Sequence, residues 1–181
     1  MIWKAAGTTN LGCVLALTNQ ASDAVGVITA GLAAERSIGG TAYQPWWLAN
    51  CSIAYATLGD FEAAWSSIDE AMTAVEAVRE KWFEADIHRT AGEIARMQAD
   101  LPKAETYFEQ ALAVARAQQA KSWELRAATS MARLWREQAK RNEAYALLAP
   151  IYGWFTEGFG TLDLKEAKAL LDELTQLGVT S

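Results

Sequence analysis

Small, apolar and aromatic residues recur along the chain at a constant interval of 40 residues. The interval is most regular for alanine, at Ala24, Ala64, Ala104 and Ala144. A large apolar residue follows each alanine by four positions, at Ile28, Ile68, Phe108 and Leu148. A small residue precedes each by twelve, at Gly12, Ser52, Gly92 and Ala132. Aromatic residues keep the same step, at Trp3, Tyr43, Phe83 and Trp123. Several columns with one spacing and no insertion indicate a repeat architecture.

Each period contains two amphipathic segments whose apolar residues recur every three or four positions, which is typical of α-helices. In the second period the pattern predicts one helix over about 44–58 and another over about 61–79. Gly59 suits the tight turn between them, and Asp60 suits the cap of the second helix. Asp100 begins the corresponding helix of the third period. The chain is therefore predicted to be a series of helical hairpins.

The predicted fold class is all-α: a right-handed α-solenoid of four hairpins of about 40 residues, closed by a C-terminal capping helix. The predicted hairpins cover residues 3–42, 43–82, 83–122 and 123–160, and the capping helix covers 163–177, all within one domain, 1–181. The small residues are interpreted as places where the two helices of a hairpin approach closely, with Ala64 opposite Ser52. A larger residue there would overpack the pair at a cost of about 1–3 kcal/mol.

The second period resembles the tetratricopeptide (TPR) repeat family. The residues that match its pattern in order are Leu48, Ser52, Tyr55, Gly59, Ala64, Ile68 and Ala71. Ala99 and Ala139 replace the turn glycine in the later periods, and the usual TPR repeat has about 34 residues, so a longer second helix is expected. The resemblance covers roughly residues 3–178. It implies a protein that binds other proteins and is not an enzyme.

The C-terminal segment 147–174 resembles the closing part of large bacterial regulators, in which helical repeats follow an AAA- or STAND-type ATPase and a cyclase or DNA-binding domain. This resemblance implies the C-terminal sensing or scaffold part of a signalling regulator. The chain itself contains no GxxxxGK[ST] phosphate loop.

Charge and composition exclude several classes of function. The net charge of −6 argues against a general nucleic-acid binder, which needs an excess of Lys and Arg. No stretch approaches the roughly 18 apolar residues of a membrane span. Cys13 and Cys51 are too few for a disulfide framework or a zinc site, and they are predicted to be buried thiols in a cytoplasmic protein. No metal or cofactor is expected.

Candidate catalytic residues are scarce. His88 is the only histidine, and its position in the first helix of the third period indicates a partly buried structural residue. Glu84 and Asp86 are close to it in sequence, but HExxH, CxxC and GxSxG motifs are absent.

Residues spaced by three, four and seven on the first helix of each hairpin are predicted to line a concave groove, whose surface is expected to run from apolar to basic with five arginines against two acids. The candidate partner-binding residues are Arg89, Arg96, Arg126, Arg133, Arg136, Trp46 and Ile53. Asp86 with Arg126 and Glu93 with Arg133 are predicted to pair between neighbouring helices, because each pair is 40 residues apart. That pairing leaves Arg89, Arg96 and Arg136 unmatched. These arginines are either ordinary solvated charges or a site for the carboxylates of an acidic or C-terminal peptide.

The first predicted helix is apolar nearly all round, with Lys4 as its only charge. Such a helix needs cover on both sides, either from an upstream segment or domain or from a second copy of the chain. The predicted function is a protein-interaction or scaffold module. The alternative is a small-molecule sensor domain that regulates an associated ATPase or cyclase, with a closed pocket near Trp46 and Trp82.

Overall fold

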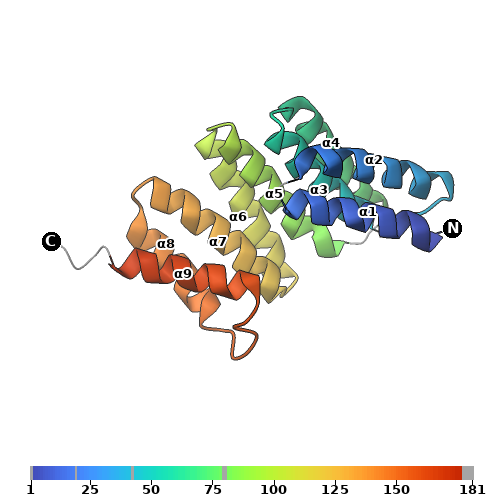
Figure 1. Cartoon of the computed structure of the whole chain (residues 1–181). Helices are drawn as coiled ribbons and strands as arrows, with labels where there is room; N and C mark the ends of the chain where they lie inside the picture. Colours follow the sequence, from blue (N-terminus) through green and yellow to red (C-terminus); the bar gives the residue numbers. More distant parts are fainter. Residues whose placement is uncertain (1, 19, 42, 79–80, 177–181) are drawn as a thin grey trace.

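The computed structural model describes residues 2–18, 20–41, 43–78 and 81–176, and within these ranges side-chain positions from residue 6 onward except that of Val78. Within these ranges the chain forms nine α-helices and one 3-10 turn, with no strand (Figure 1). The elements are α1 (Ile2–Leu17), α2 (Ala21–Ser37), α3 (Gln44–Thr57), α4 (Phe61–Val78), η1 (Lys81–Phe83), α5 (Glu84–Met97), α6 (Leu101–Ala117), α7 (Lys121–Glu137), α8 (Arg141–Tyr152) and α9 (Leu162–Gln176).

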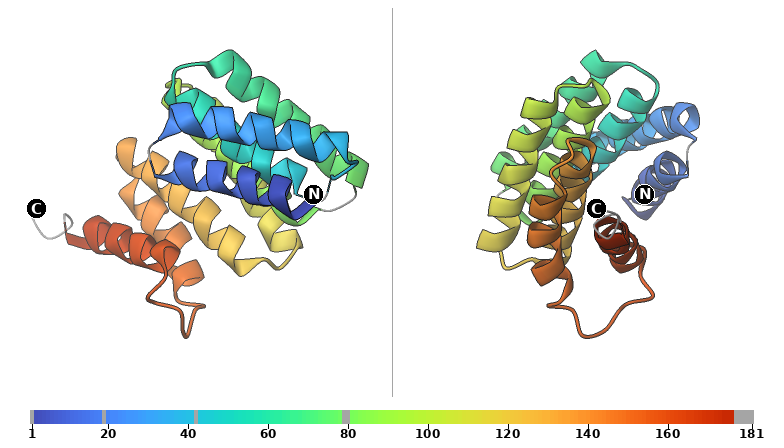
Figure 2. Two further views of the ribbon diagram at one scale, coloured as in Figure 1. Left: turned by 45° about the vertical axis from the view of Figure 1, so that its right-hand side comes forward. Right: turned by 90° about the vertical axis from the view of Figure 1, so that its left-hand side faces the viewer.

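The helices form a two-layered stack of four hairpins followed by α9, which confirms the predicted all-α solenoid. The inner layer consists of the odd-numbered helices, because α1, α3, α5, α7 and α9 contact one another in that order. Each even-numbered helix packs against its own hairpin partner and against the next odd-numbered helix. The stack curves, so that α1 and α9 lie on the same concave side (Figure 2).

The predicted caps are present at the two turns where they were expected. The Asp60 carboxylate accepts a hydrogen bond of 3.1 Å from the backbone N–H of Ala63, and Asp100 accepts one of 3.2 Å from Lys103. The predicted helix 61–79 is observed as α4, and its last predicted residue, Arg79, lies outside the described residues. The predicted capping helix is observed as α9, and Leu177 lies outside the described residues in the same way.

The turns repeat every 20 residues, which is half of the period seen in the sequence. A residue with positive φ ends a helix at Gly39, Gly59, Ala99, Gln119 and Ala139. The connection between α6 and α7 therefore has the same form as the turns within the hairpins α3–α4, α5–α6 and α7–α8. Glycine adopts this left-handed conformation without steric cost, whereas alanine does not.

Replacing Ala99 or Ala139 by glycine is expected to raise the free energy of unfolding by about 0.5–1 kcal/mol. Ala99 has φ of 60° and Ala139 has φ of 61°, and both are exposed, so glycine removes strain without opening a cavity. Urea denaturation would measure the change. Ala113→Gly is the matched control: Ala113 is exposed inside α6, where glycine should destabilise by about 1 kcal/mol. A loss of stability in the turn variants would contradict the prediction.

The 40-residue columns form the core. The four alanines at 24, 64, 104 and 144 are completely buried, and the large residues that follow them are at most 3% exposed. The glycines of the small-residue column lie against these large residues, because a Cβ at Gly12 would meet Ile28 and a Cβ at Gly92 would meet Phe108. The sequence analysis expected each small residue to lie close to the alanine of the facing helix. At Gly12 and Gly92 the close contact is instead with Ile28 and Phe108, four positions after that alanine. The side chain of Trp3 lies outside the described part of the chain.

None of the described helices is both long enough and apolar enough to cross a membrane.

Candidate functional site: a groove on the concave face

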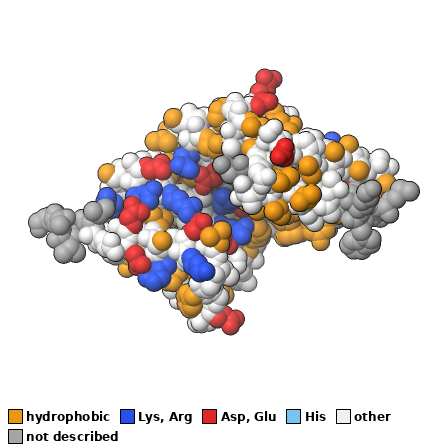
Figure 3. All heavy atoms as spheres, viewed as in Figure 1, with side chains coloured by type: hydrophobic (Ala, Val, Ile, Leu, Met, Phe, Trp, Pro, Cys, Tyr) orange, Lys and Arg blue, Asp and Glu red, His pale blue; other side chains and the backbone are white. Residues whose placement is uncertain are grey.

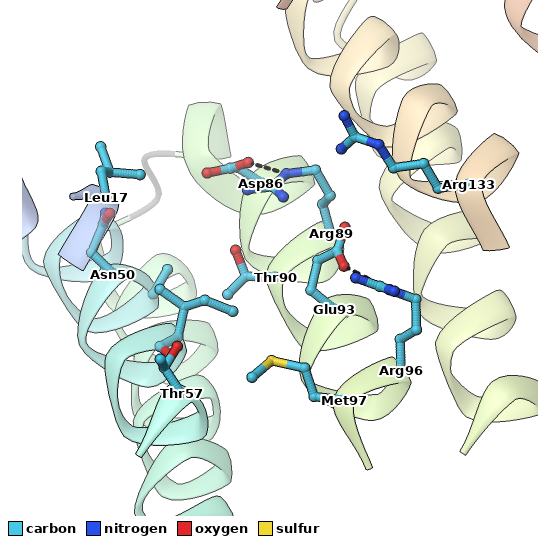
Figure 4. Close-up of a pocket in the computed structure, with 12 residues that line it drawn as sticks. Leu17, Asn50, Thr57, Asp86, Arg89, Thr90, Glu93, Arg96, Met97 and Arg133 are labelled. Atoms are coloured by element: carbon cyan, nitrogen blue, oxygen red, sulfur yellow. Dashed lines mark hydrogen bonds and ion pairs between the residues drawn. The ribbon is translucent and has the colours of Figure 1, made fainter. Parts of the chain in front are cut away.

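Two adjoining cavities, of about 360 and 390 Å³, lie along the inner layer of helices, and together we call them the groove. They share five lining residues: Leu17, Asn50, Asp86, Arg89 and Arg133. The lining comes from all five odd-numbered helices, because each presents one face to the concave side. Figure 4 shows the part of the groove between α3, α5 and α7.

One wall of the groove is apolar. It consists of Leu17 from α1 with Trp46, Ala49 and Ile53 from α3, and Met97 continues it at the end of α5. Leu17 is 75% exposed. At the opposite end, Leu162 at the start of α9 lines the same cavity and is 69% exposed. Two exposed leucines therefore stand at the two ends of the concave face.

The opposite wall is charged, and Figure 3 shows Lys, Arg, Asp and Glu side chains gathered on that half of the face. In α5, Arg89 Nε donates to Asp86 at 2.6 Å, and Arg96 Nε donates to Glu93 at 3.0 Å. The Ser130 hydroxyl of α7 donates to Glu93 at 2.6 Å. These contacts fix the two α5 carboxylates on the groove floor.

Three arginines of α7 pair with three carboxylates of α9. Their distances are 2.8 Å for Arg126 Nε to Asp163, 2.7 Å for Arg133 Nη2 to Glu166, and 2.7 Å for Arg136 Nη1 to Glu173. Arg126 also lies over the ring of Trp123, with 5.0 Å from its Cζ to the ring centroid. The charged wall therefore continues from α5 through α7 to α9.

The predicted pairing of Asp86 with Arg126 and Glu93 with Arg133 is wrong. Asp86 and Glu93 pair with arginines three residues further along α5, because neighbours on one helix face are closer than residues on the next helix. The arginines that were expected to be unmatched, Arg89, Arg96 and Arg136, all have acidic partners; that of Arg136 is Glu173, and Arg96 also contacts Glu137 at 3.1 Å.

The groove is also not basic, contrary to expectation. Its lining contains four arginines and four acidic residues, namely Arg89, Arg96, Arg126 and Arg133 with Asp86, Glu93, Asp163 and Glu166. The basic surface was expected from the arginines of α5 and α7 alone, without the acids of α9. The α9 acids could have been recognised as groove-facing residues from the sequence, because Glu166 and Glu173 lie 40 residues after Arg126 and Arg133.

Arginine and acidic side chains share the surface of the charged wall. On α5 the acid is the more buried partner, with Asp86 9% and Arg89 24% exposed, whereas Glu166 of α9 is 42% exposed and its partner Arg133 35%. Arg89, Arg126 and Arg133 each bond their acid through a single nitrogen. A guanidinium has further N–H donors in a fixed plane, so each of these arginines retains donors for a bound anion.

Arg89 stays charged although it lies deep in the groove. Burial on its own would lower its pKa, but the neighbouring carboxylate of Asp86, and at greater distance Glu93 and Asp163, outweigh that effect and raise the pKa. The guanidinium is therefore a permanent cation at the centre of the groove.

Six of the seven candidate partner-binding residues line the groove. The seventh, Arg136, is bonded to Glu173 and lines neither cavity. Leu17 and Leu162 were not predicted as groove residues, because no periodic column marks the point where the two ends of the curved stack approach each other. Asn50 was missed although it lies between Trp46 and Ile53 on α3.

Groups that could carry chemistry lie away from the groove. His88 is half-buried beside Tyr107, with 6.3 Å between ring centroids, and burial lowers its pKa. Cys13 and Cys51 are free, buried thiols, as predicted. Burial raises the pKa of Cys13 to about 12 and that of Cys51 to about 11, so neither is a reactive thiolate. Among the described residues no group of three or more His, Cys, Asp or Glu side chains could hold a metal ion.

Comparison with solved structures gives matches along nearly the whole chain. A crystal structure of TPR-like repeats from a Podosopora anserina protein described as a kinesin light chain superimposes with a TM-score of 0.67 and 14% identity, covering 98% of this chain and 88% of the other. A glutamine-to-methionine variant of those repeats superimposes with a TM-score of 0.69 and 14% identity, covering 97% and 86%. The fold is that of the TPR-like repeat proteins.

At this identity the TPR-like likeness shows the fold alone. No family model matches the sequence, and no curated protein matches it either. The resemblance of segment 147–174 to the closing part of ATPase or cyclase regulators stays a prediction.

Proposed function

We propose that this TPR-like chain is a protein-interaction module that holds a segment of a partner protein in its groove. The main support is the pairing of an exposed apolar wall with a wall of arginine–carboxylate pairs along one continuous concave face. Such a face offers desolvation for apolar side chains and directed hydrogen bonds for anionic groups, which are the two requirements of peptide recognition. In this proposal the chain acts as a scaffold and has no catalytic role.

The partner segment that fits best carries carboxylates, either side chains or a chain terminus, beside aliphatic residues. Arginine holds a carboxylate through two parallel hydrogen bonds, and Arg89, Arg126 and Arg133 keep unused donors. Leu17, Ile53 and Met97 would contact the aliphatic side chains.

Reversing the charge of Arg89 and Arg133 together is expected to weaken binding of an acidic peptide at least about tenfold, because hydrogen bonds to charged groups contribute about 1.5–3 kcal/mol each. The probe is a short fluorescein-labelled peptide of alternating Leu and Asp, measured by fluorescence anisotropy. Circular dichroism would establish that the Arg89→Glu/Arg133→Glu variant keeps its helices.

The matched control for this test is Arg141→Glu/Lys165→Glu, which changes the net charge equally at two residues outside the groove lining. This control should bind almost as well as the native chain. Equal affinity of the groove variant and the native chain, or equal loss in the control, would contradict a groove that recognises carboxylates.

The alternative function, a small-molecule sensor domain for an ATPase or cyclase, needs an enclosed pocket near Trp46 and Trp82. Trp46 lines the groove, but Trp82 is exposed and lines neither cavity. The groove is also bordered by eight charged side chains on one wall. These observations favour a peptide, and a metabolite that raised the melting temperature strongly would reverse the preference.

We also propose that the outer face of α1 contacts a second copy of the chain or a preceding segment. Leu11 and Val14 are exposed on this helix outside the groove lining, and residues 6–17 carry no charge. A second copy would appear in sedimentation velocity as a coefficient that rises with concentration, and a constant coefficient would exclude it. A preceding segment agrees with the C-terminal part of a larger bacterial, cytoplasmic signalling regulator.

A further inference from the structure

The apolar residues of α9 make its buried contact with the rest of the stack. Its apolar face is buried against the last hairpin through Leu164, Ala167, Leu170, Leu171 and Leu174. The ion pairs with α7 lie at the edge of that contact and are partly exposed, at 40% and 32% for Arg126 and Asp163. Exposed pairs of this kind add little to stability. The ion pairs between α7 and α9 are therefore expected to have a role other than holding α9 in place.

Asp163 and Glu166 occupy the same arginines that an acidic partner would use. Both carboxylates line the groove together with Arg126 and Arg133. Each accepts one hydrogen bond from one guanidinium nitrogen. A partner carboxylate that approaches Arg126 or Arg133 meets a guanidinium that is already partly neutralised, and it is repelled by the adjacent carboxylate of α9.

We propose that Asp163 and Glu166 act as a built-in competitor for the groove arginines. This inference rests on the proposed function, because it concerns the affinity of the same site for acidic segments. The α9 carboxylates lower the affinity for every acidic segment. A ligand with one carboxylate only exchanges one ion pair for another, whereas a segment with several carboxylates in register with Arg89, Arg126 and Arg133 gains more than it displaces. The competitor thus selects for partners with clustered negative charge.

The same helix carries a natural contrast on its outer face. Lys168 and Asp172 pair within α9, with 2.8 Å between Nζ and Oδ2, and neither lines the groove. Removing the charge of Asp172 therefore changes the charge of α9 without releasing a groove arginine. Glu109, exposed on α6, offers a second acidic residue outside the groove.

The decisive variant is Asp163→Asn/Glu166→Gln, in which both side chains keep similar size but lose their charge. Its affinity for the labelled Leu–Asp peptide is expected to rise about tenfold over the native chain, since each exposed pair accounts for up to about fivefold. The control Glu109→Gln/Asp172→Asn removes the same charge and should change the affinity less than about twofold. An equal rise in the control would attribute the gain to net charge and would overturn the inference.

A double-mutant cycle tests whether the effect passes through the arginine. Glu166→Gln should tighten binding in the native background and should tighten it much less in the Arg133→Gln background, where repulsion is removed but no guanidinium is released. Tightening of the same size in both backgrounds would overturn the inference.

Failure of this inference can be distinguished from failure of the proposed function. If the native chain binds the Leu–Asp peptide and the α9 variant binds it equally well, the groove function stands and the competitor does not exist. If only the α9 variant binds measurably, both are supported. If neither binds at the highest concentration, both are contradicted.

Discussion

Replacing Phe108 by alanine is expected to lower the free energy of unfolding by about 3–5 kcal/mol. Phe108 is completely buried in α6, and it is among the largest fully buried side chains of the described residues. Its ring lies against Gly92 of the neighbouring helix α5. Because glycine has no side chain that could move into the vacated space, the cavity left by the ring cannot collapse easily. The loss of stability at Phe108 is therefore expected to be large among Phe→Ala substitutions in protein cores.

Urea denaturation followed by tryptophan fluorescence would measure the loss at Phe108, and thermal denaturation should show a decrease in Tm of about 10 °C. Phe108→Leu is the graded control, which keeps most of the apolar volume and should cost less than about 1.5 kcal/mol. A cost below about 1 kcal/mol for Phe108→Ala would mean that α5 and α6 close over the cavity, contrary to the tight contact at Gly92.

Replacing Gly12 by alanine is expected to lower the free energy of unfolding by about 1–3 kcal/mol. A Cβ at Gly12 would lie 2.5 Å from Cγ1 of Ile28 and 2.9 Å from its backbone nitrogen. The side chain of Ile28 could rotate away, but the backbone of α2 cannot, so α1 and α2 must separate. The loss of contact between these two helices opposes the higher helix propensity of alanine.

The control for Gly12→Ala is Gly26→Ala, for which the expected change in the free energy of unfolding has the opposite sign. Gly26 lies on an exposed position of α2, and a Cβ there would have no atom within 4 Å. Gly26→Ala should therefore raise the free energy of unfolding by about 0.5–1 kcal/mol, because glycine is the weaker helix former. Chemical denaturation of both variants would test the pair, and stabilisation by both would show that α1 and α2 are not in close contact at Gly12.

The arrangement of the helices was predictable from the sequence, since it depends on local and periodic signals. Asp60 and Asp100 mark helix starts through their caps, and Gly59 marks a turn through its positive φ. The buried columns could be found for the same reason, because a solenoid buries equivalent positions of every repeat in equivalent contacts. The turns at Ala99 and Ala139 were recognised from the repeat, although alanine replaces glycine there. The turns between hairpins at Gly39 and Gln119, and with them the 20-residue spacing, were missed, because the two positions share no residue type.

The candidate site was predictable only as a set of positions. Helical spacing was enough to select Arg89, Arg126 and Arg133 as groove residues. It could not select their partners, because an ion pair forms only when the charged atoms lie within about 4 Å. Side-chain conformation and the register between helices decide which charges come that close. The pairs chosen by the 40-residue step were wrong, and the groove proved neutral where the sequence indicated a basic surface.

By itself, the sequence determined a four-hairpin solenoid, its caps, its buried columns and the face on which a groove would form. These depend on hydrophobic burial and backbone geometry, which repeat with the chain. Only the tertiary structure decided which charges meet, that α9 supplies acids to the α7 arginines, and that Leu17 and Leu162 border the same groove. Those facts arise from the curvature of the whole stack, which brings together helices far apart in the sequence.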